Sequence, residues 1–163
     1  ISVMRGTPLM LQIIVVYFAP YYMFRMKMGP GYRFPAVIIA FVINYAAYFA
    51  EIYRGGIESM PQGQYEAAKI LGYTKAQTFI RIILPQVIKR ILPAITNETI
   101  TLVKDTSLAF TIGVTEMFTM AKALASGQVS MLPYAFAALF YYILNLVVAF
   151  IMERIEKKMN YYR

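Results

Sequence analysis

Two carboxylates, Glu98 and Asp105, lie in a long and otherwise largely apolar part of the chain. A charged side chain at the centre of a membrane-spanning helix costs roughly 2.5–3.5 kcal/mol on insertion scales, so such groups usually face protein or water. The two acids are seven residues apart, which is two helical turns, and they share one face with Thr101, while Asn97 lies beside it. This stripe could hold the ammonium or guanidinium group of a small cationic ligand.

Two other interpretations of the same acids stay open. Either carboxylate could have a structural role by pairing with Lys104 or with another helix. The pair could also form the cation or proton site of an ion-coupled carrier or channel, although such carriers usually contain inverted repeats and no internal repeat is visible here. A membrane scaffold without transport activity would leave both acids without a role.

Membrane-spanning helices are the elements that must position these acids. The 163-residue chain is 60% hydrophobic and 15% charged, which is too apolar for an ordinary soluble domain. Three stretches contain no charged residue, and each has at least the ~17 residues that a helix needs to cross the hydrocarbon core. A fourth long stretch contains both acids. The four predicted spans are Pro8–Phe24, Phe34–Ala50, Ile91–Met117 and Leu132–Met152.

The net charge of +8 is distributed unevenly along the chain. With four alternating spans, one side of the membrane receives eleven basic residues and the other side four. The positive-inside rule then places residues 54–90 and the C-terminus in the cytoplasm. The basic excess is therefore a topology signal, and we expect no nucleic-acid partner.

Several chemistries are excluded by composition. The chain has no cysteine, and so no disulfide framework or thiolate metal site, and no histidine, which is the commonest general base and metal ligand. It also lacks the G-x-x-x-x-G-K-[ST] loop that cradles nucleotide phosphates. We therefore expect no enzyme activity, no cofactor and no metal site in this chain.

The loop between the second and third predicted spans, about residues 57–88, has an unusual spacing. Glu66-Ala67-Ala68 is followed after three residues by Gly72, and after nine more by Ile82-x-Leu84-Pro85. Gly72 permits a sharp turn between two short helices, because it lacks a Cβ, and the two alanines leave room for the close approach of another surface. The alternative is an amphipathic helix lying on the inner leaflet, which the loop's lysines and arginine would suit.

This spacing resembles the EAA loop of the permease subunits of bacterial ABC importers. Three other stretches resemble the polar amino acid branch of that family, the arginine/histidine/glutamine type: Val3–Leu9, Ala50–Ile57 and Asn97–Leu108. The resemblance covers nearly the whole chain. It implies an all-α integral membrane protein, a polytopic helical bundle of the permease type in which residues 1–163 form one transmembrane domain. It also implies a further span before Ile1, which would give five in all.

The resemblance also implies a function. A permease subunit of this type forms the translocation path of an ATP-driven amino acid importer, and the two acids favour a basic substrate such as arginine, lysine or histidine. The residues that the polar stripe predicts to bind substrate are Glu98, Asp105, Asn97 and Thr101. The residues that match the EAA motif, and would couple the permease to its ATPase, are Glu66, Ala67, Ala68, Gly72, Ile82, Leu84 and Pro85.

The implied partners follow from the same resemblance. They are two ATP-binding subunits, which would hold ATP and Mg, a second permease copy as a homodimer or close paralogue, and an extracytoplasmic amino acid-binding protein. The implied location is the bacterial plasma (inner) membrane, as a multi-pass protein with the coupling loop and the C-terminus in the cytoplasm.

Overall fold

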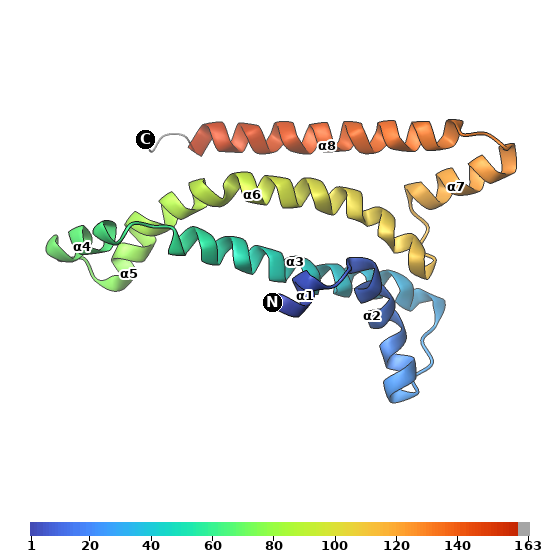
Figure 1. The fold of residues 1–163 in the computed structure, drawn as a ribbon, viewed down its shortest axis with the longest axis horizontal. Coiled ribbons are helices and arrows are strands. Elements are labelled where there is room, and N and C mark those ends of the chain that lie inside the picture. Colours follow the sequence, from blue (N-terminus) through green and yellow to red (C-terminus); the bar gives the residue numbers. More distant parts are fainter. Residues whose placement is uncertain (160–163) are drawn as a thin grey trace.

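The computed structural model describes residues 1–159, which are helical almost throughout and contain no strand. The helix α6 lies between α3 and α8, while α4 and α5 lie at one end of the molecule and α7 at the other (Figure 1). The elements, in chain order, are α1 (Ser2–Gly6), α2 (Leu9–Phe24), η1 (Pro30–Tyr32), α3 (Arg33–Glu58), α4 (Gln62–Ile70), α5 (Lys75–Thr78), η2 (Phe79–Ile83), α6 (Leu84–Asp105), η3 (Thr106–Ile112), α7 (Met117–Gln128) and α8 (Leu132–Met159).

Two helices in the described part of the chain are long and apolar enough to cross a membrane. They are Pro30–Glu58, which joins η1 to α3, and α8, with 29 and 28 residues. The apolar helix α2 matches the first predicted span but has only 16 residues. The helix α6 is long enough but not apolar enough, because it contains five charged residues: Lys89, Arg90, Glu98, Lys104 and Asp105. All four predicted spans therefore contain helix. Two of the four, the second and the last, lie in helices that are both long and apolar enough to cross a membrane.

The third predicted span is wrong at both ends. Its α-helix begins at Leu84 rather than Ile91 and ends at Asp105, after which the chain tightens into the 3₁₀-helix η3. The hydroxyls of Thr106, Ser107 and Thr111 each donate to the carbonyl three residues earlier, at 2.7, 2.9 and 2.9 Å. These short-range bonds favour the narrower 3₁₀ winding.

The second predicted span extends further than its apolar run. The predicted span ends at Ala50, and the glycine pair Gly55-Gly56 would favour a helix end soon after it, but α3 continues to Glu58. Packing explains the difference, since Gly56 is buried where α3 crosses α6. A Cβ on Gly56 would lie 2.3 Å from Ile91 Cγ2 and 3.1 Å from Val87 Cγ1. Gly56 is therefore a contact point between α3 and α6 and not a helix stop.

This contact gives a stability prediction. We expect Gly56→Ala to destabilise the protein by about 1–3 kcal/mol, because the new methyl overlaps the buried Ile91 side chain and forces it to move. Gly55→Ala is the matched control, since nothing lies within 4 Å of a Cβ there and alanine favours the helix. The measurement is thermal unfolding of the detergent-solubilised protein. A Gly56→Ala variant as stable as Gly55→Ala would show that the two helices do not pack as described.

Candidate functional site

Three of the four predicted substrate residues line one cavity. Glu98, Thr101 and Asp105 face a space of about 520 Å³ between the α1–α2 turn, α3 and α6. The spacing of three and four residues places them on one helical stripe, as predicted. The other lining residues are Arg5, Gly6, Thr7, Pro8, Leu9, Asn44, Tyr45, Tyr48 and Leu108.

Asn97, the fourth predicted substrate residue, is exposed and does not line this cavity. It immediately precedes Glu98, and adjacent residues on a helix point about 100° apart, so the two side chains diverge. The structure therefore brings Glu98, Thr101 and Asp105 together and leaves Asn97 outside.

The two acids have different surroundings. Asp105 Oδ2 accepts a hydrogen bond of 2.8 Å from the hydroxyl of Tyr45, which is buried on α3. Glu98 is partly buried. Within residues 1–159 neither acid forms an ion pair, and Lys104 pairs with neither of them. The structural role through Lys104 is therefore not found among the described residues. Pairing with another helix is found for Asp105, through its hydrogen bond with Tyr45 of α3.

A polar network holds the α1–α2 turn against the cavity. The Gln12 amide Nε2 donates to the Met4 carbonyl at 2.8 Å and to the Thr7 hydroxyl at 2.8 Å. The buried Asn44 of α3 donates to Gln12 Oε1 at 3.0 Å and to the Met4 carbonyl at 3.3 Å. These bonds satisfy backbone groups that the break before Pro8 leaves open, and they fix α1 beside α3. The cavity wall is therefore tied to two helices.

Arg5 brings a positive charge to the same cavity. Its guanidinium lies 5.4 Å from the centre of the Tyr48 ring, and its Nη1 is 3.7 Å from Glu51 Oε1. Arginine over an aromatic face is a favourable arrangement that leaves the edge of the guanidinium open to an anion. With Glu98 and Asp105, the cavity has one basic and two acidic side chains, and its formal charge is −1.

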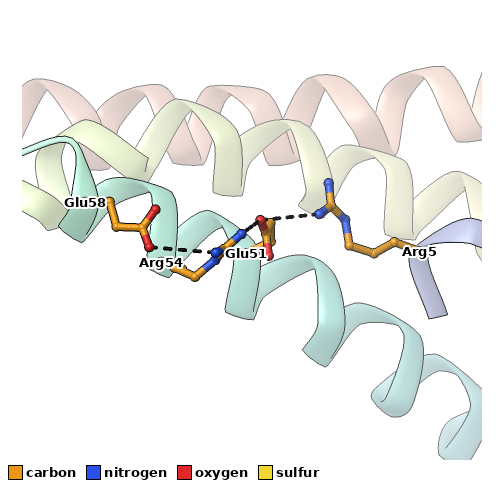
Figure 2. Close-up of polar contacts among 4 residues, drawn as sticks. All are labelled: Arg5, Glu51, Arg54 and Glu58. Atoms are coloured by element: carbon orange, nitrogen blue, oxygen red, sulfur yellow. Dashed lines mark hydrogen bonds and ion pairs between the residues drawn. The ribbon is translucent and has the colours of Figure 1, made fainter. Parts of the chain in front are cut away.

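An ionic chain extends from Arg5 along α3. Figure 2 shows Glu51 contacting Arg5 on one side and Arg54 on the other, and Arg54 in turn facing Glu58, with 3.7 Å between Arg54 Nη1 and Glu58 Oε1. These ion pairs with Arg5 and Arg54 give Glu51 a structural role. This row of ion pairs links the cavity wall to the end of α3 that leads into α4.

The predicted turn of the coupling loop is present. The helix α4 ends before Gly72, whose φ of +77° is in the left-handed region that favours glycine. The backbone N–H of Tyr73 then donates to the Ala68 carbonyl at 3.0 Å, which closes the turn. Thr74 and Gln77 form a capping box that starts α5. Gly72 thus separates two short helices.

The EAA residues divide into an inner and an outer set. Ala68 is buried at 1% exposure, whereas Glu66 and Ala67 are exposed. At the tip of the turn, Ile70 and Leu71 are 86% and 72% exposed. Two large apolar side chains at a loop tip are unfavourable in water, so this surface has the character of a contact site.

The remaining motif residues lie elsewhere. Ile82, Leu84 and Pro85 are partly buried where the chain continues into α6, and they are not part of the tip. The π-turn η2 precedes Pro85, which has no N–H and whose ring crowds the carbonyl four residues earlier. The Gln86 side chain donates to the Ile82 carbonyl at 2.8 Å. We predicted two short helices on either side of Gly72, but the second does not end within the loop, because α5, η2 and α6 form one continuous helical segment.

Sequence reasoning missed three cavity residues. Arg5 enters the sequence analysis only within the stretch Val3–Leu9, and Tyr45 and Tyr48 are not among its candidate site residues. A signal for the tyrosines was available, because positions 41, 44, 45 and 48 recur at helical spacing on the face that carries Asn44. The position of Arg5 depends on how α1 folds back, for which the sequence has no comparable signal.

Comparisons with known proteins agree with this architecture. A family model described as binding-protein-dependent transport system inner membrane component matches residues 1–161. A probable amino-acid permease protein, YxeN of Bacillus subtilis, is 38% identical over 161 residues, covering 98% of this chain and 71% of that protein. The glutamine transport system permease protein GlnP of Escherichia coli K12 is 37% identical over 162 residues, covering 98% and 73%.

Solved structures give the same result. A crystal structure of an amino acid ABC transporter with histidines matches with a TM-score of 0.83 and 35% identity, over 96% of this chain and 72% of that one. The MetNI methionine ABC transporter in an inward-facing conformation matches with a TM-score of 0.77 at 18% identity, which shows a shared fold. The predicted resemblance to ABC importer permeases is confirmed. The chain belongs to the family of binding-protein-dependent transport system inner membrane components.

Proposed function

We propose that this chain forms the translocation path of an ATP-driven importer of a polar amino acid, and that the substrate is a basic one. The cavity shared by Arg5, Glu98 and Asp105 is the observation that carries the proposal. A free amino acid has an ammonium and a carboxylate group, so its site needs charges of both signs. A basic amino acid has two cationic groups and one anionic group, the complement of this cavity. The relatives named for glutamine and L-cystine support the amino acid class.

The roles of the side chains follow from their charges. The Arg5 guanidinium donates paired N–H hydrogen bonds to the substrate carboxylate, as guanidinium groups do. Glu98 binds a cationic group, and Asp105, oriented by the Tyr45 hydroxyl, binds the second. Thr101 contributes a hydroxyl between them.

Coupling is proposed to occur at the turn around Gly72. Glu66, Ala67 and the exposed Ile70 and Leu71 dock into a groove of an ATP-binding subunit, which holds ATP and Mg. Because α5, η2 and α6 are continuous, a displacement of the docked turn reaches the helix that carries Glu98 and Asp105 without crossing a loop. The proposed assembly has two ATP-binding subunits, a second permease copy and an extracytoplasmic binding protein. It lies in the bacterial inner membrane, with the turn and the C-terminus in the cytoplasm.

The substrate assignment gives a prediction for the cavity acids. In the reconstituted importer, Glu98→Gln should raise the KM for a basic amino acid by roughly tenfold or more, since a hydrogen bond to a charged group is worth about 1.5–3 kcal/mol. Asp105→Asn should act in the same direction. Basal ATP hydrolysis should stay within about twofold of the wild type, because neither acid lies in the coupling turn.

The control is Asn97→Ala, on the same helix but outside the cavity, which should leave the KM unchanged. Competition by unlabelled arginine, lysine, histidine, glutamine, cystine and glutamate identifies the substrate class. Wild-type KM values in both acid variants would show that the acids are structural. Competition by glutamine or glutamate alone would contradict the basic substrate and leave the importer function intact.

A further inference from the structure

A second cavity lies at the base of the coupling loop, away from the substrate cavity. It has a volume of about 800 Å³, within the ~300–1,000 Å³ typical of small-ligand sites. It opens between the end of α3, the start of α4 and the first turns of α6. None of its lining residues, all of which belong to the described part of the chain, is acidic, and three of them are basic: Arg81, Lys89 and Arg90.

The basic residues are partly fixed in place. Arg90 Nη1 donates to the Ser59 carbonyl at 2.6 Å and to the Ser59 hydroxyl at 3.1 Å, so its guanidinium is held at the C-terminal end of α3. Arg81 forms no ion pair or hydrogen bond within residues 1–159. Among the described residues that line it, the cavity thus has positive charge from the two arginines and Lys89 and no carboxylate, which suits an anionic ligand.

The apolar surroundings indicate what kind of anion. Met60, Ile82 and Pro93 line the cavity beside the basic groups. On the outside of the same helical segment, Ile80 is 61% exposed and Ile88 is 37% exposed. A free phosphate ion would gain nothing from these side chains, whereas the acyl chains of a lipid would cover them.

We propose that this basal cavity binds the headgroup of an anionic phospholipid of the inner leaflet. Basic pockets between helices on the cytoplasmic side are suited to such headgroups. An acidic surface of the ATPase is a less suitable occupant, because the cavity is lined by Pro61 and Gln64 at the beginning of α4, whereas the exposed tip is at Ile70 and Leu71 at its end. The inference rests on the proposed membrane orientation and does not depend on the substrate assignment.

The test is binding of dioctanoyl-phosphatidylglycerol to the full-length importer complex in detergent, followed by native mass spectrometry. Each basic residue near an anionic lipid surface contributes about fivefold in affinity, so Arg81→Gln/Lys89→Gln should bind about 25-fold more weakly. The matched control, Lys75→Gln/Lys158→Gln, removes the same charge from exposed positions outside the cavity and should bind as the wild type does. The charge-conserving Arg81→Lys/Lys89→Arg should retain binding, which separates loss of charge from misfolding.

Several outcomes decide the proposal. The proposal is supported if the wild type and the control variant bind phosphatidylglycerol more tightly than phosphatidylcholine and the cavity variant Arg81→Gln/Lys89→Gln does not. Equal binding of the two lipids, displacement by millimolar inorganic phosphate, or unchanged binding in the cavity variant overturns it. Loss of the ATPase from the cavity variant, with lipid binding unchanged, assigns the cavity to the ATPase and also overturns it. Because the assay needs neither transport nor ATP, its failure is distinguishable from failure of the proposed function.

Discussion

Replacing Gly72 with proline is expected to abolish ATP-driven uptake, lowering the rate at least ~100-fold. Gly72 has φ of +77°, and proline is restricted to φ near −65°, so the turn between α4 and α5 cannot form with proline at this position. The substitution also removes the N–H that donates to the Lys69 carbonyl at 3.1 Å. The exposed Ile70 and Leu71 would then point in a new direction, and the ATPase would lose its docking surface.

The expected loss is in coupling and not in insertion. The turn lies outside the helices that are long enough to span, so the Gly72→Pro permease should still be recovered from membranes at normal yield. Copurification of the ATPase and uptake are the two measurements. Gly63→Ala is the control in the same loop, because nothing lies within 4 Å of a Cβ at Gly63 and its φ is not positive. Normal ATPase copurification together with unaltered uptake in Gly72→Pro would remove the basis for the docking assignment.

Helix positions were largely predictable because charge avoidance in a membrane is a strong physical constraint. The stretch from Pro8 to Phe24 has no charged residue, and its bounds agree with those of α2 to within one residue. The uncharged stretch that begins at Leu132 likewise predicts the first residue of α8. The turn at Gly72 and the cap at Thr74 were predictable for a local reason, since each depends on residues within one helical turn.

Helix ends that depend on tertiary contacts were not predictable in this way. The helix α3 continues through Gly55 and Gly56 because α6 packs against it, and the sequence alone makes the glycine pair resemble a helix stop. Similarly, Pro85 has no N–H for the helical hydrogen bonds, so the sequence alone favours a helix break at this position. A π-turn and the Gln86 side chain accommodate it within one continuous helical segment.

The cavity that we propose binds substrate was predictable in part. Helical spacing places Glu98, Thr101 and Asp105 on one face, and the cavity contains all three. The contribution of Arg5 depends on α1 folding back against α3 through Gln12 and Asn44, a contact between residues up to 40 positions apart. Spacing along one helix cannot reveal such a contact, and the balance of charge in the cavity became apparent only from the structure.

Uptake of a basic amino acid should depend completely on ATP supplied at the face that carries the coupling turn. The chain has no cysteine, so Gln77→Cys in α5 and Gly31→Cys in η1, just before the start of α3, report the two faces without background labelling of this chain. Impermeant thiol reagents should reach Gln77→Cys only from the cytoplasmic face and Gly31→Cys only from the outside, since the basic residues other than Arg5 and Lys104 divide ten to four between these faces.

The most direct test that this chain is the path of an ATP-driven importer is to measure on which face of the membrane ATP must be supplied for uptake. The complete importer is reconstituted in proteoliposomes whose orientation is assigned by the two cysteines, and labelled arginine is supplied with its binding protein on the face that exposes Gly31→Cys. ATP on the face that exposes Gln77→Cys should drive accumulation, and ATP on the other face, or a proton gradient without ATP, should drive none. Accumulation driven by the gradient alone would contradict the importer and identify an ion-coupled carrier.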